Sequence, residues 1–217
     1  VTSQNLKMNK LIFSAGIVSC LIISCSNPSQ SGKSGSESNE IVIANDGAIY
    51  AACKQGVQKS TDGGNTFLKQ EKIINPIKNG WDQKVDGLFR ANGLPFTACD
   101  NSNGPNKGRI YICWSDEKNG IKNKDVFLTF SDDEGENWCE PILVTYHPNH
   151  KEQFMPFLTI DQTTGYVYIL YYSRQNYVSG DLTDVYMAIS KNGGLKFEYY
   201  KINEESFHPN KLIFFGD

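Results

Sequence analysis

The chain has 217 residues and a formal net charge of −3, with 21 lysines and arginines against 24 aspartates and glutamates. This balance excludes the basic footprint of a nucleic-acid-binding protein and gives no reason to expect a polyanion as partner. The three histidines and six cysteines form no CxxC pair and no Cys/His cluster, so we expect neither a metal site nor another cofactor.

Residues 1–25 have the pattern of upstream residues and a secretory signal rather than of a folded element. A basic start at Met8-Asn9-Lys10 precedes an apolar run from Leu11 to Ser24. That run is shorter than the roughly 20 apolar residues that a membrane-spanning helix needs. We therefore expect the chain to cross a membrane and to be cleaved.

The apolar run ends in Leu21-Ile22-Ile23-Ser24-Cys25, which resembles the lipobox of bacterial lipoproteins. The resemblance implies that Cys25 is lipidated and anchors the protein, after export across the inner membrane, to the outer membrane or cell surface. An ordinary secretory signal with a chance cysteine is the alternative. Residues 26–40 are rich in Ser, Gly and Asn, and we expect a flexible tether there because so few apolar groups cannot offset the ordering entropy.

From residue 41 onward, short runs of β-branched and aromatic residues alternate with turn clusters, without a helical period. These runs predict three groups of four strands. The groups are 41–44, 49–52, 56–60 and 66–69; then 96–100, 109–114, 125–131 and 138–144; and then 157–160, 167–172, 184–190 and 197–202. A run at 212–215 would begin a fourth group.

One pattern, Ser-x-(Asp/Asn)-x-Gly-x-x-aromatic, recurs at residues 60–67, 131–138 and 190–197, which we name boxes 1, 2 and 3. Successive boxes are separated by about one four-stranded propeller blade. The Asp or Asn can accept hydrogen bonds from turn N–H groups, Gly supplies a positive φ, and the aromatic can pack under the turn. We therefore expect hairpin staples rather than catalytic carboxylates. The residues that define the boxes are Ser60, Asp62, Gly64 and Phe67; Ser131, Asp133, Gly135 and Trp138; and Ser190, Asn192, Gly194 and Phe197.

With these boxes, residues 41–217 resemble the BNR or Asp-box repeat proteins of the sialidase superfamily. The resemblance implies an all-β fold, a six-bladed β-propeller of which about three to three and a half blades are present here. It also implies that each box lies between the third and fourth strands of a blade, away from the substrate face. Asn192 in place of Asp, and Asn137 and Lys196 in place of the usual Thr, would weaken individual turns. Residues 214–217 resemble the start of an inner strand in such proteins, so we expect an incomplete gene product.

Sialidases, as the resemblance implies, bind a substrate carboxylate with three arginines and use an Asp acid/base and a Tyr nucleophile activated by a Glu. The candidates for substrate binding here are Arg90 and Arg174, with a surface position as the alternative for each. Arg109 follows a Lys-Gly pair, and we expect it to be a solvated turn residue. The Phe/Tyr-Arg-Ile-Pro motif that opens sialidase catalytic domains is absent from the sequence, which counts against sialidase chemistry.

Asp116 is the candidate catalytic residue, because a loop after a predicted strand could present its carboxylate over a pocket. Asp100 and Asp161 hold similar positions, but Asp161 fits a hairpin turn better, and the alternative for Asp116 is the cap of a loop. Four aromatic residues could stack on sugar rings, although strand aromatics more often pack between blades. They are Trp114, Tyr171, Tyr172 and Tyr177.

Two functions fit these patterns. One is a surface glycoside hydrolase of exo-α-sialidase type, and the other is a non-catalytic propeller that binds glycan or protein. We expect a monomer whose partner is a glycan or glycoprotein. Outside the signal, Cys53, Cys99, Cys113 and Cys139 leave open either a Cys99–Cys113 disulfide or buried thiols.

Overall fold

The computed structural model describes residues 40–43, 49–52, 56–67, 72–73, 82–88, 91–93, 95–145 and 151–209. Several expectations lie outside these residues: the signal, the lipidation site at Cys25, the side chains of Arg90 and Cys53, and the strand expected at 212–215. In the part of the chain that is described, no helix has the length and apolar character to cross a membrane.

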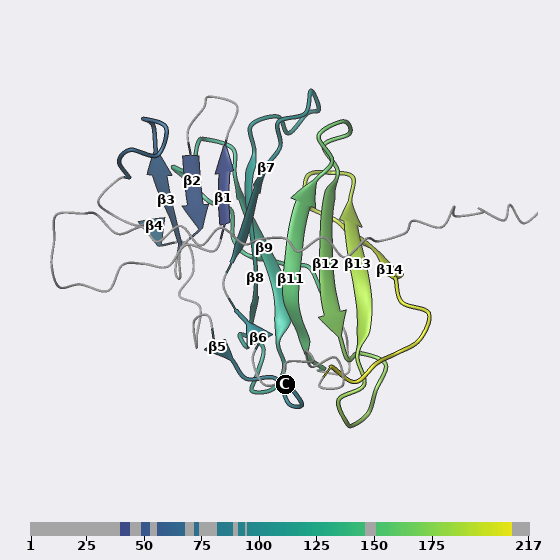
Figure 1. The fold of residues 1–217 in the computed structure, drawn as a ribbon. Helices are drawn as coiled ribbons and strands as arrows, with labels where there is room; N and C mark the ends of the chain where they lie inside the picture. The colour runs from purple at the N-terminus through teal and green to yellow at the C-terminus, as the bar shows by residue number, and fades with distance from the viewer. Residues whose placement is uncertain are drawn as a thin grey trace, which may run out of the picture.

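The described residues form three four-stranded antiparallel sheets, each in simple chain order (Figure 1). The first sheet contains β1 (Glu40–Ile43), β2 (Ile49–Ala52), β3 (Gly56–Ser60) and β4 (Lys72–Ile73). The second contains β7 (Phe96–Cys99), β8 (Ile110–Asp116), β9 (Asp125–Ser131) and β10 (Ile142–Leu143). The third contains β11 (Gln153–Ile160), β12 (Val167–Ser173), β13 (Asp184–Ser190) and β14 (Glu198–Lys201). The prediction of three four-stranded groups is confirmed, and the chain is part of a β-propeller.

The fourth strands of the first two sheets are shorter and begin later than predicted, at Lys72–Ile73 rather than 66–69 and at Ile142–Leu143 rather than 138–144. Two further differences have local reasons. The third sheet begins at Gln153 rather than at residue 157, because the strand continues through Pro156 by way of a bulge. The register shifts between Phe154 and Phe157, and Met155 has a φ of 50°. Since proline lacks an N–H group, it is tolerated in a strand at such a bulge. The short hairpin of β5 (Asp82–Gln83) and β6 (Ala91–Asn92) was not predicted, because two-residue strands leave no periodic pattern.

The two ends of the sheets differ in the loops they carry. Boxes 1, 2 and 3 each follow the third strand of a sheet, as predicted, and we call this the box end. In Figure 1, β3 and β13 point up towards it, whereas β2 and β12 point down. β8 and β12 end at the opposite end, where β9, β11 and β13 begin. We call this opposite end, marked by Asp116, Gln153 and Ser173, the distal end.

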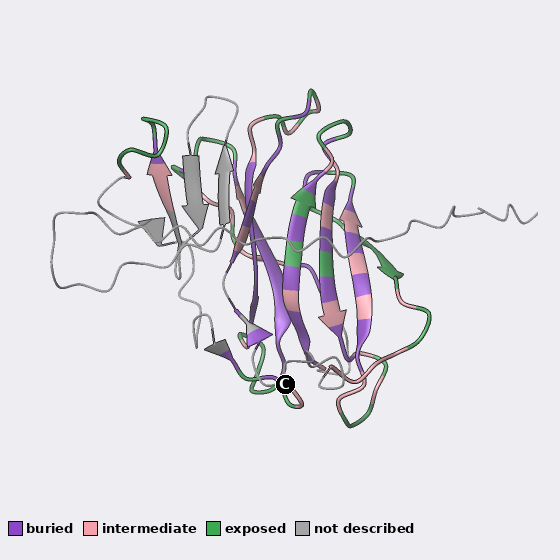
Figure 2. Cartoon of the chain, in the orientation of Figure 1, coloured by how far each residue is buried: buried purple, intermediate pink, exposed green. Residues whose placement is uncertain are grey.

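The main hydrophobic core lies between the second and third sheets. It joins Tyr111, Val126 and Leu128 of the second sheet to Ile169 and Ala188 of the third. A second cluster, on the other face of the second sheet, includes Ile110, Ile112, Trp114 and Phe127. β8 is therefore buried along its whole length, whereas β12 and β13 alternate between buried and more exposed residues (Figure 2).

The cysteines of the second sheet do not form the disulfide that spacing left open. Cys99 pairs in register with Ile110, whereas Cys113 pairs with Phe96, so the two lie at opposite ends of the β7–β8 ladder. Both thiols are buried, and no disulfide joins them to each other or to Cys139.

Candidate functional site

The three boxes fold into the same hydrogen-bonded turn. In box 1 the N–H of Gly64 donates to Ser60 Oγ at 2.9 Å, and the N–H of Thr66 donates to Asp62 Oδ1 at 2.8 Å. Boxes 2 and 3 repeat both bonds at 2.7–2.9 Å. The donors are Gly135 and Asn137 in box 2 and Gly194 and Lys196 in box 3. Each box residue predicted to accept a turn hydrogen bond does so.

The residue two positions after the last turn glycine, which is Thr66, Asn137 or Lys196, affects the turn less than expected. Thr66 Oγ1 donates to Asp62 Oδ2 at 2.6 Å, and Asn137 Nδ2 makes the equivalent bond to Asp133 at 2.6 Å. The expected weakening of box 2 by Asn137 is therefore wrong, because an amide N–H replaces the hydroxyl donor. Box 3 keeps only the backbone bond from Lys196. The aromatic residues Trp138 and Phe197 pack against the hydrophobic clusters under their turns.

Hydrogen bonds within box 1 account for the acidity of Asp62. The hydroxyl and backbone N–H of Thr66, followed by the Ser60 hydroxyl, lower the pKa of Asp62 to about 2. Donors to a carboxylate favour its ionised form. The Asp62 carboxylate thus accepts bonds from its own turn, which agrees with a hairpin staple.

Arg109 is not the solvated turn residue that the sequence predicted. Its side chain is 12% exposed and binds Asp132 of box 2 through two hydrogen bonds, at 2.6 and 2.8 Å. Its Nη1 donates to the carbonyl of Gly193 in box 3 at 2.8 Å, and its guanidinium lies 3.8 Å from the ring centre of Phe130. The residue therefore joins boxes of neighbouring sheets, a contact between residues far apart in sequence.

At the distal end, four charged side chains form a connected ionic cluster. Lys124 Nζ lies 2.7 Å from Glu117 Oε1 and 2.8 Å from Glu152 Oε1. Arg174 Nη1 lies 3.3 Å from Glu152 Oε2. The side chains of Lys124 and Glu152 are only 2% and 9% exposed. Backbone bonds from Gln153 to Lys124 and from Arg174 to Glu152 hold the three segments together. We call these four residues the distal ionic cluster.

Arg174 follows β12 at the distal end, and its guanidinium is already engaged. Nη2 donates to the carbonyl of Asp86 at 2.6 Å, Nε donates to Thr183 Oγ1 at 3.3 Å, and Nη1 donates to Glu152. Burial lowers the pKa of Arg174 below its usual range, and the negative charge of Glu152 opposes this shift. Arg174 is thus an anchor of three segments as well as a candidate ligand-binding group.

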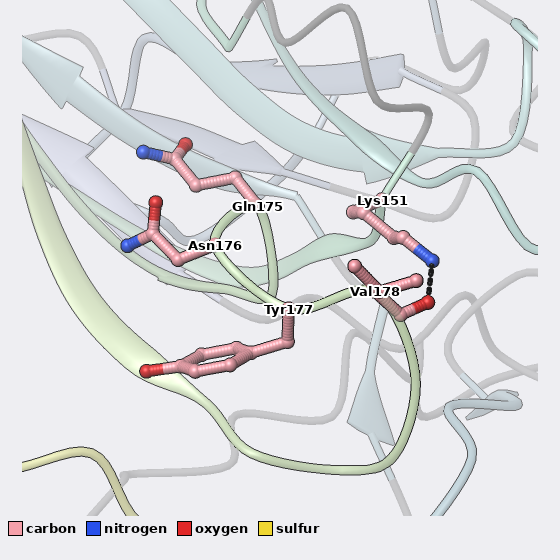
Figure 3. A pocket seen from close by; sticks show the side chains of 5 residues that line it. All are labelled: Lys151, Gln175, Asn176, Tyr177 and Val178. Atoms are coloured by element: carbon pink, nitrogen blue, oxygen red, sulfur yellow. Dashed lines mark hydrogen bonds between the residues drawn. The ribbon is translucent and has the colours of Figure 1, made fainter.

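Two hollows open at the distal end beside this cluster. The larger, of about 370 Å³, is lined by charged groups that include Asp86, Lys122, Glu152 and Arg174. The smaller, of about 260 Å³, is lined by Lys151, Gln175, Asn176, Tyr177 and Val178 (Figure 3). Lys151 and Tyr177 line both hollows. Among the described side chains, no group of three His, Cys, Asp or Glu is arranged as a metal site.

The candidate aspartates lie at opposite ends. Asp116 ends β8 at the distal end, paired in register with Asp125, and is 4% exposed. It does not line either hollow described above. Asp100 and Asp161 follow β7 and β11 at the box end, so the expectation that they could face the same pocket is wrong. Asp161 accepts bonds from Thr163 and Thr164, first of all from the Thr164 hydroxyl, and these lower its pKa as expected for a turn residue.

Of the four aromatic candidates, one lines the hollows. Trp114 and Tyr171 are 1% and 2% exposed in the core, where burial raises the pKa of Tyr171. Tyr172 packs against Phe154 and Phe207. Tyr177 is the candidate that remains available to a ligand in either hollow.

Sequence reasoning missed Lys124 and Glu152. Each stands directly before a strand of the structure, Lys124 before β9 and Glu152 before β11. Charged residues at the ends of strands are usually solvated, so composition alone did not distinguish these two. One signal was available. Lys124 and Glu152 precede strands that start at the distal end of neighbouring sheets, and Arg174 follows a strand that finishes at the same end.

No protein-family model matches the sequence, and no curated protein matches it. The structure is similar to that of an α-L-arabinanase from Penicillium chrysogenum in complex with arabinobiose, with a TM-score of 0.51 and 15% identity, covering 77% of this chain and 49% of the other. It is also similar to the α-L-arabinofuranosidase Arb93A from Fusarium graminearum in complex with an iminosugar inhibitor, with a TM-score of 0.50 and 14% identity, covering 77% and 48%. A Hadza microbial sialidase has a TM-score of 0.45 and 18% identity, covering 72% and 35%. The chain spans about half the length of the first two structures, and the likeness shows a fold shared with β-propeller glycoside hydrolases.

Proposed function

We propose that this chain is part of a β-propeller glycoside hydrolase that acts on glycans outside the cell and binds them at the distal end. The observation that carries the proposal is the distal ionic cluster, which supplies Glu152 and Arg174 to the wall of the larger hollow. Burying charges costs free energy, and such groups gather at functional sites. The arabinanase and the arabinofuranosidase of the same fold were solved with sugar-like ligands, which supports a carbohydrate ligand.

Glu152 is the carboxylate best placed for chemistry in this hollow. Lys124 and Arg174 fix its two oxygens, so its orientation is set before a ligand binds. A positioned carboxylate can stabilise the positive charge that develops on a sugar ring as a glycosidic bond breaks. Asp116, at the same end of the second sheet, is buried and does not line this hollow, so we assign it no acid/base role there.

The engagement of Arg174 bears on the choice of sugar. A sialidase-type site would use this guanidinium, together with Arg90, to bind a substrate carboxylate. Here Arg174 already donates to Glu152, Thr183 and the Asp86 carbonyl, so an acidic sugar would have to share it. This favours a neutral sugar over a sialic acid in the larger hollow.

A second candidate function is a glycan-binding propeller without catalysis. The observation in its favour is that both oxygens of Glu152 are held by cations, Oε1 by Lys124 and Oε2 by Arg174. Such a carboxylate is less available to attack a sugar carbon. Binding with no turnover in the assay below would select this function.

The test uses the full-length protein with fluorogenic sialosides and arabinofuranosides and with a glycan array. Glu152→Gln removes the charge that faces the hollow, whereas Glu198→Gln is a matched control in an exposed pair with Lys191. We expect Glu152→Gln to lower binding or turnover about 30-fold or more, the usual result of breaking a desolvated charge pair. Arg174→Lys, which keeps the charge but loses the fork, should lower it less.

Unchanged glycan handling by a folded Glu152→Gln protein would contradict the proposal, as would a wild-type protein that neither binds nor cleaves any glycan. Thermal melting of each variant distinguishes loss of the site from loss of the fold. If Glu152→Gln does not fold, Arg174→Lys carries the test.

We also propose that the protein is held at the cell envelope by a lipid on Cys25, on the strength of the lipobox-like sequence alone. Mass spectrometry of the protein from its native host should show a diacylglyceryl cysteine at that position. A soluble form cut elsewhere would overturn this.

A further inference from the structure

The larger and smaller hollows are neighbours that share two wall residues, Lys151 and Tyr177. In Figure 3 the Tyr177 ring extends away from Lys151, and the side chains of Gln175 and Asn176 also lie on the side of the loop away from Lys151. Lys151 Nζ donates to the carbonyl of Val178 at 2.5 Å, which fixes it across the loop. Tyr177 and Lys151 thus lie at the boundary between the two hollows.

The ring of Tyr177 is held in place from its hydroxyl end. The hydroxyl donates to Asp184 Oδ2 at 3.0 Å and forms a short hydrogen bond with Ser206 Oγ. Asp184 is 1% exposed and also binds Lys201 Nζ at 2.9 Å and Asn176 Nδ2 at 3.0 Å. Burial would raise the pKa of Asp184, but bonds from Ser206, Lys201 and Asn176 outweigh it and hold the pKa below its usual value. The hydroxyl group is therefore an anchor, which leaves the ring of Tyr177 to line the hollows.

The two hollows differ in the chemistry they offer. The larger is lined by charged groups, among them Glu152, Arg174 and Asp86. The smaller is lined by the ring of Tyr177, the aliphatic Val178 and the amides of Gln175 and Asn176. Its one charged group, Lys151, is bound to the Val178 carbonyl, and Asn176 Nδ2 is bound to Asp184. Sugars present hydroxyl groups that bond to amides and C–H faces that pack on aromatic rings. The smaller hollow therefore fits a neutral sugar unit.

We propose that the two hollows are adjacent sugar subsites, with Tyr177 and Lys151 at the boundary between them. This inference rests on the proposed function, since it assigns the larger hollow to the sugar next to the cleaved or recognised bond. The smaller hollow then binds the following, neutral unit of the same chain, stacked on Tyr177. The protein should accordingly require at least a disaccharide for full affinity.

Calorimetric titration of the full-length protein tests this with two ligand series. One series is arabinose, arabinobiose and arabinotriose, and the other is N-acetylneuraminic acid and sialyllactose. In the series that binds, the step from one sugar to two should raise affinity at least about tenfold, and Tyr177→Ala should remove most of that gain. Tyr177→Phe, which keeps the ring but not its anchor, should keep part of it. Tyr166→Ala is the matched control, because Tyr166 precedes β12 at the box end.

Each result decides the inference in a distinguishable way. If monosaccharide and disaccharide bind equally, or if Tyr177→Ala weakens both by the same factor, the second subsite is wrong while the proposed function stands. If the wild-type protein binds neither series and no glycan on the array, the proposed function fails and the subsites fail with it. A Tyr177→Ala protein that does not fold leaves the length dependence of the wild-type protein and the Tyr177→Phe variant to decide.

Discussion

Replacing Arg109 by alanine should destabilise the propeller without affecting its ligand site. The Arg109 side chain crosses from box 2 to box 3, with two bonds to Asp132, one to the Gly193 carbonyl and a stacking contact with Phe130. All of these contacts are at the box end. The hollows are at the distal end of the same sheets, so stability and binding can be separated.

The contacts set the size of the effect. The Asp132 side chain is 60% exposed, so its ion pair with Arg109 contributes at most about 1 kcal/mol. The charged hydrogen bond to the Gly193 carbonyl adds about 1.5 kcal/mol, and the cation–π contact with Phe130 about 0.5–1 kcal/mol. A total of about 2–3 kcal/mol lowers Tm by about 5–10 °C for a protein of this size.

Differential scanning calorimetry of the full-length protein measures this effect directly. Lys191→Ala is the control, because Lys191 of box 3 forms an exposed pair with Glu198, and the loss of this pair should leave Tm within experimental error. Arg109→Lys, which cannot make the two-pronged bond to Asp132, should fall between the wild-type protein and Arg109→Ala. The reasoning is refuted if Arg109→Ala melts like the wild-type protein, or if it stays folded and loses glycan binding.

Three further predictions concern single residues. Gly193→Ala should lower Tm more than Gly180→Ala. Both glycines have positive φ, but a Cβ at Gly193 would lie 2.6 Å from neighbouring side-chain atoms, whereas a Cβ at Gly180 would meet nothing within 4 Å. Equal Tm values for the two variants would contradict this. The pKa of Asp62 in the folded protein, about 2, is below its ordinary value of 3.8. The stabilising effect of its carboxylate should therefore be complete above about pH 4 and be lost as the pH falls through about 2. In acid unfolding, the stability of Asp62→Asn should depend less on pH in this range than that of the wild-type protein. Asp184→Ala should cost about 2–4 kcal/mol of unfolding free energy in urea titrations, since it leaves Lys201 and several buried donors without their acceptor.

The elements that could be predicted from the sequence are those with a local pattern. Runs of β-branched and aromatic residues indicated the long strands, and the spacing of Ser60, Asp62 and Gly64 indicated the turn that the structure forms. Both signals depend on contacts within a few residues. Pro156 hid the start of β11 because proline is rare within strands, and a bulge at Met155 accommodates it.

The site could not be predicted in the same way, because its contacts join distant segments. Lys124 and Glu152 meet although 28 residues separate them, and Arg174 reaches the carbonyl of Asp86 across 88 residues. No periodic pattern records such pairs. The sequence did indicate Arg174, which follows an apolar strand, and Tyr177, as one of four aromatic residues that could stack on a sugar. It offered no sign of which charges neutralise the arginine or of what anchors the tyrosine.

The most direct test of the glycan site is a crystal structure of the full-length protein soaked with arabinobiose and, separately, with sialyllactose. The account predicts sugar density at the distal end, with one unit beside Glu152 and Arg174 and the next against the ring of Tyr177. Sugar bound at the box end or on an outer strand, with the two hollows empty, would contradict it.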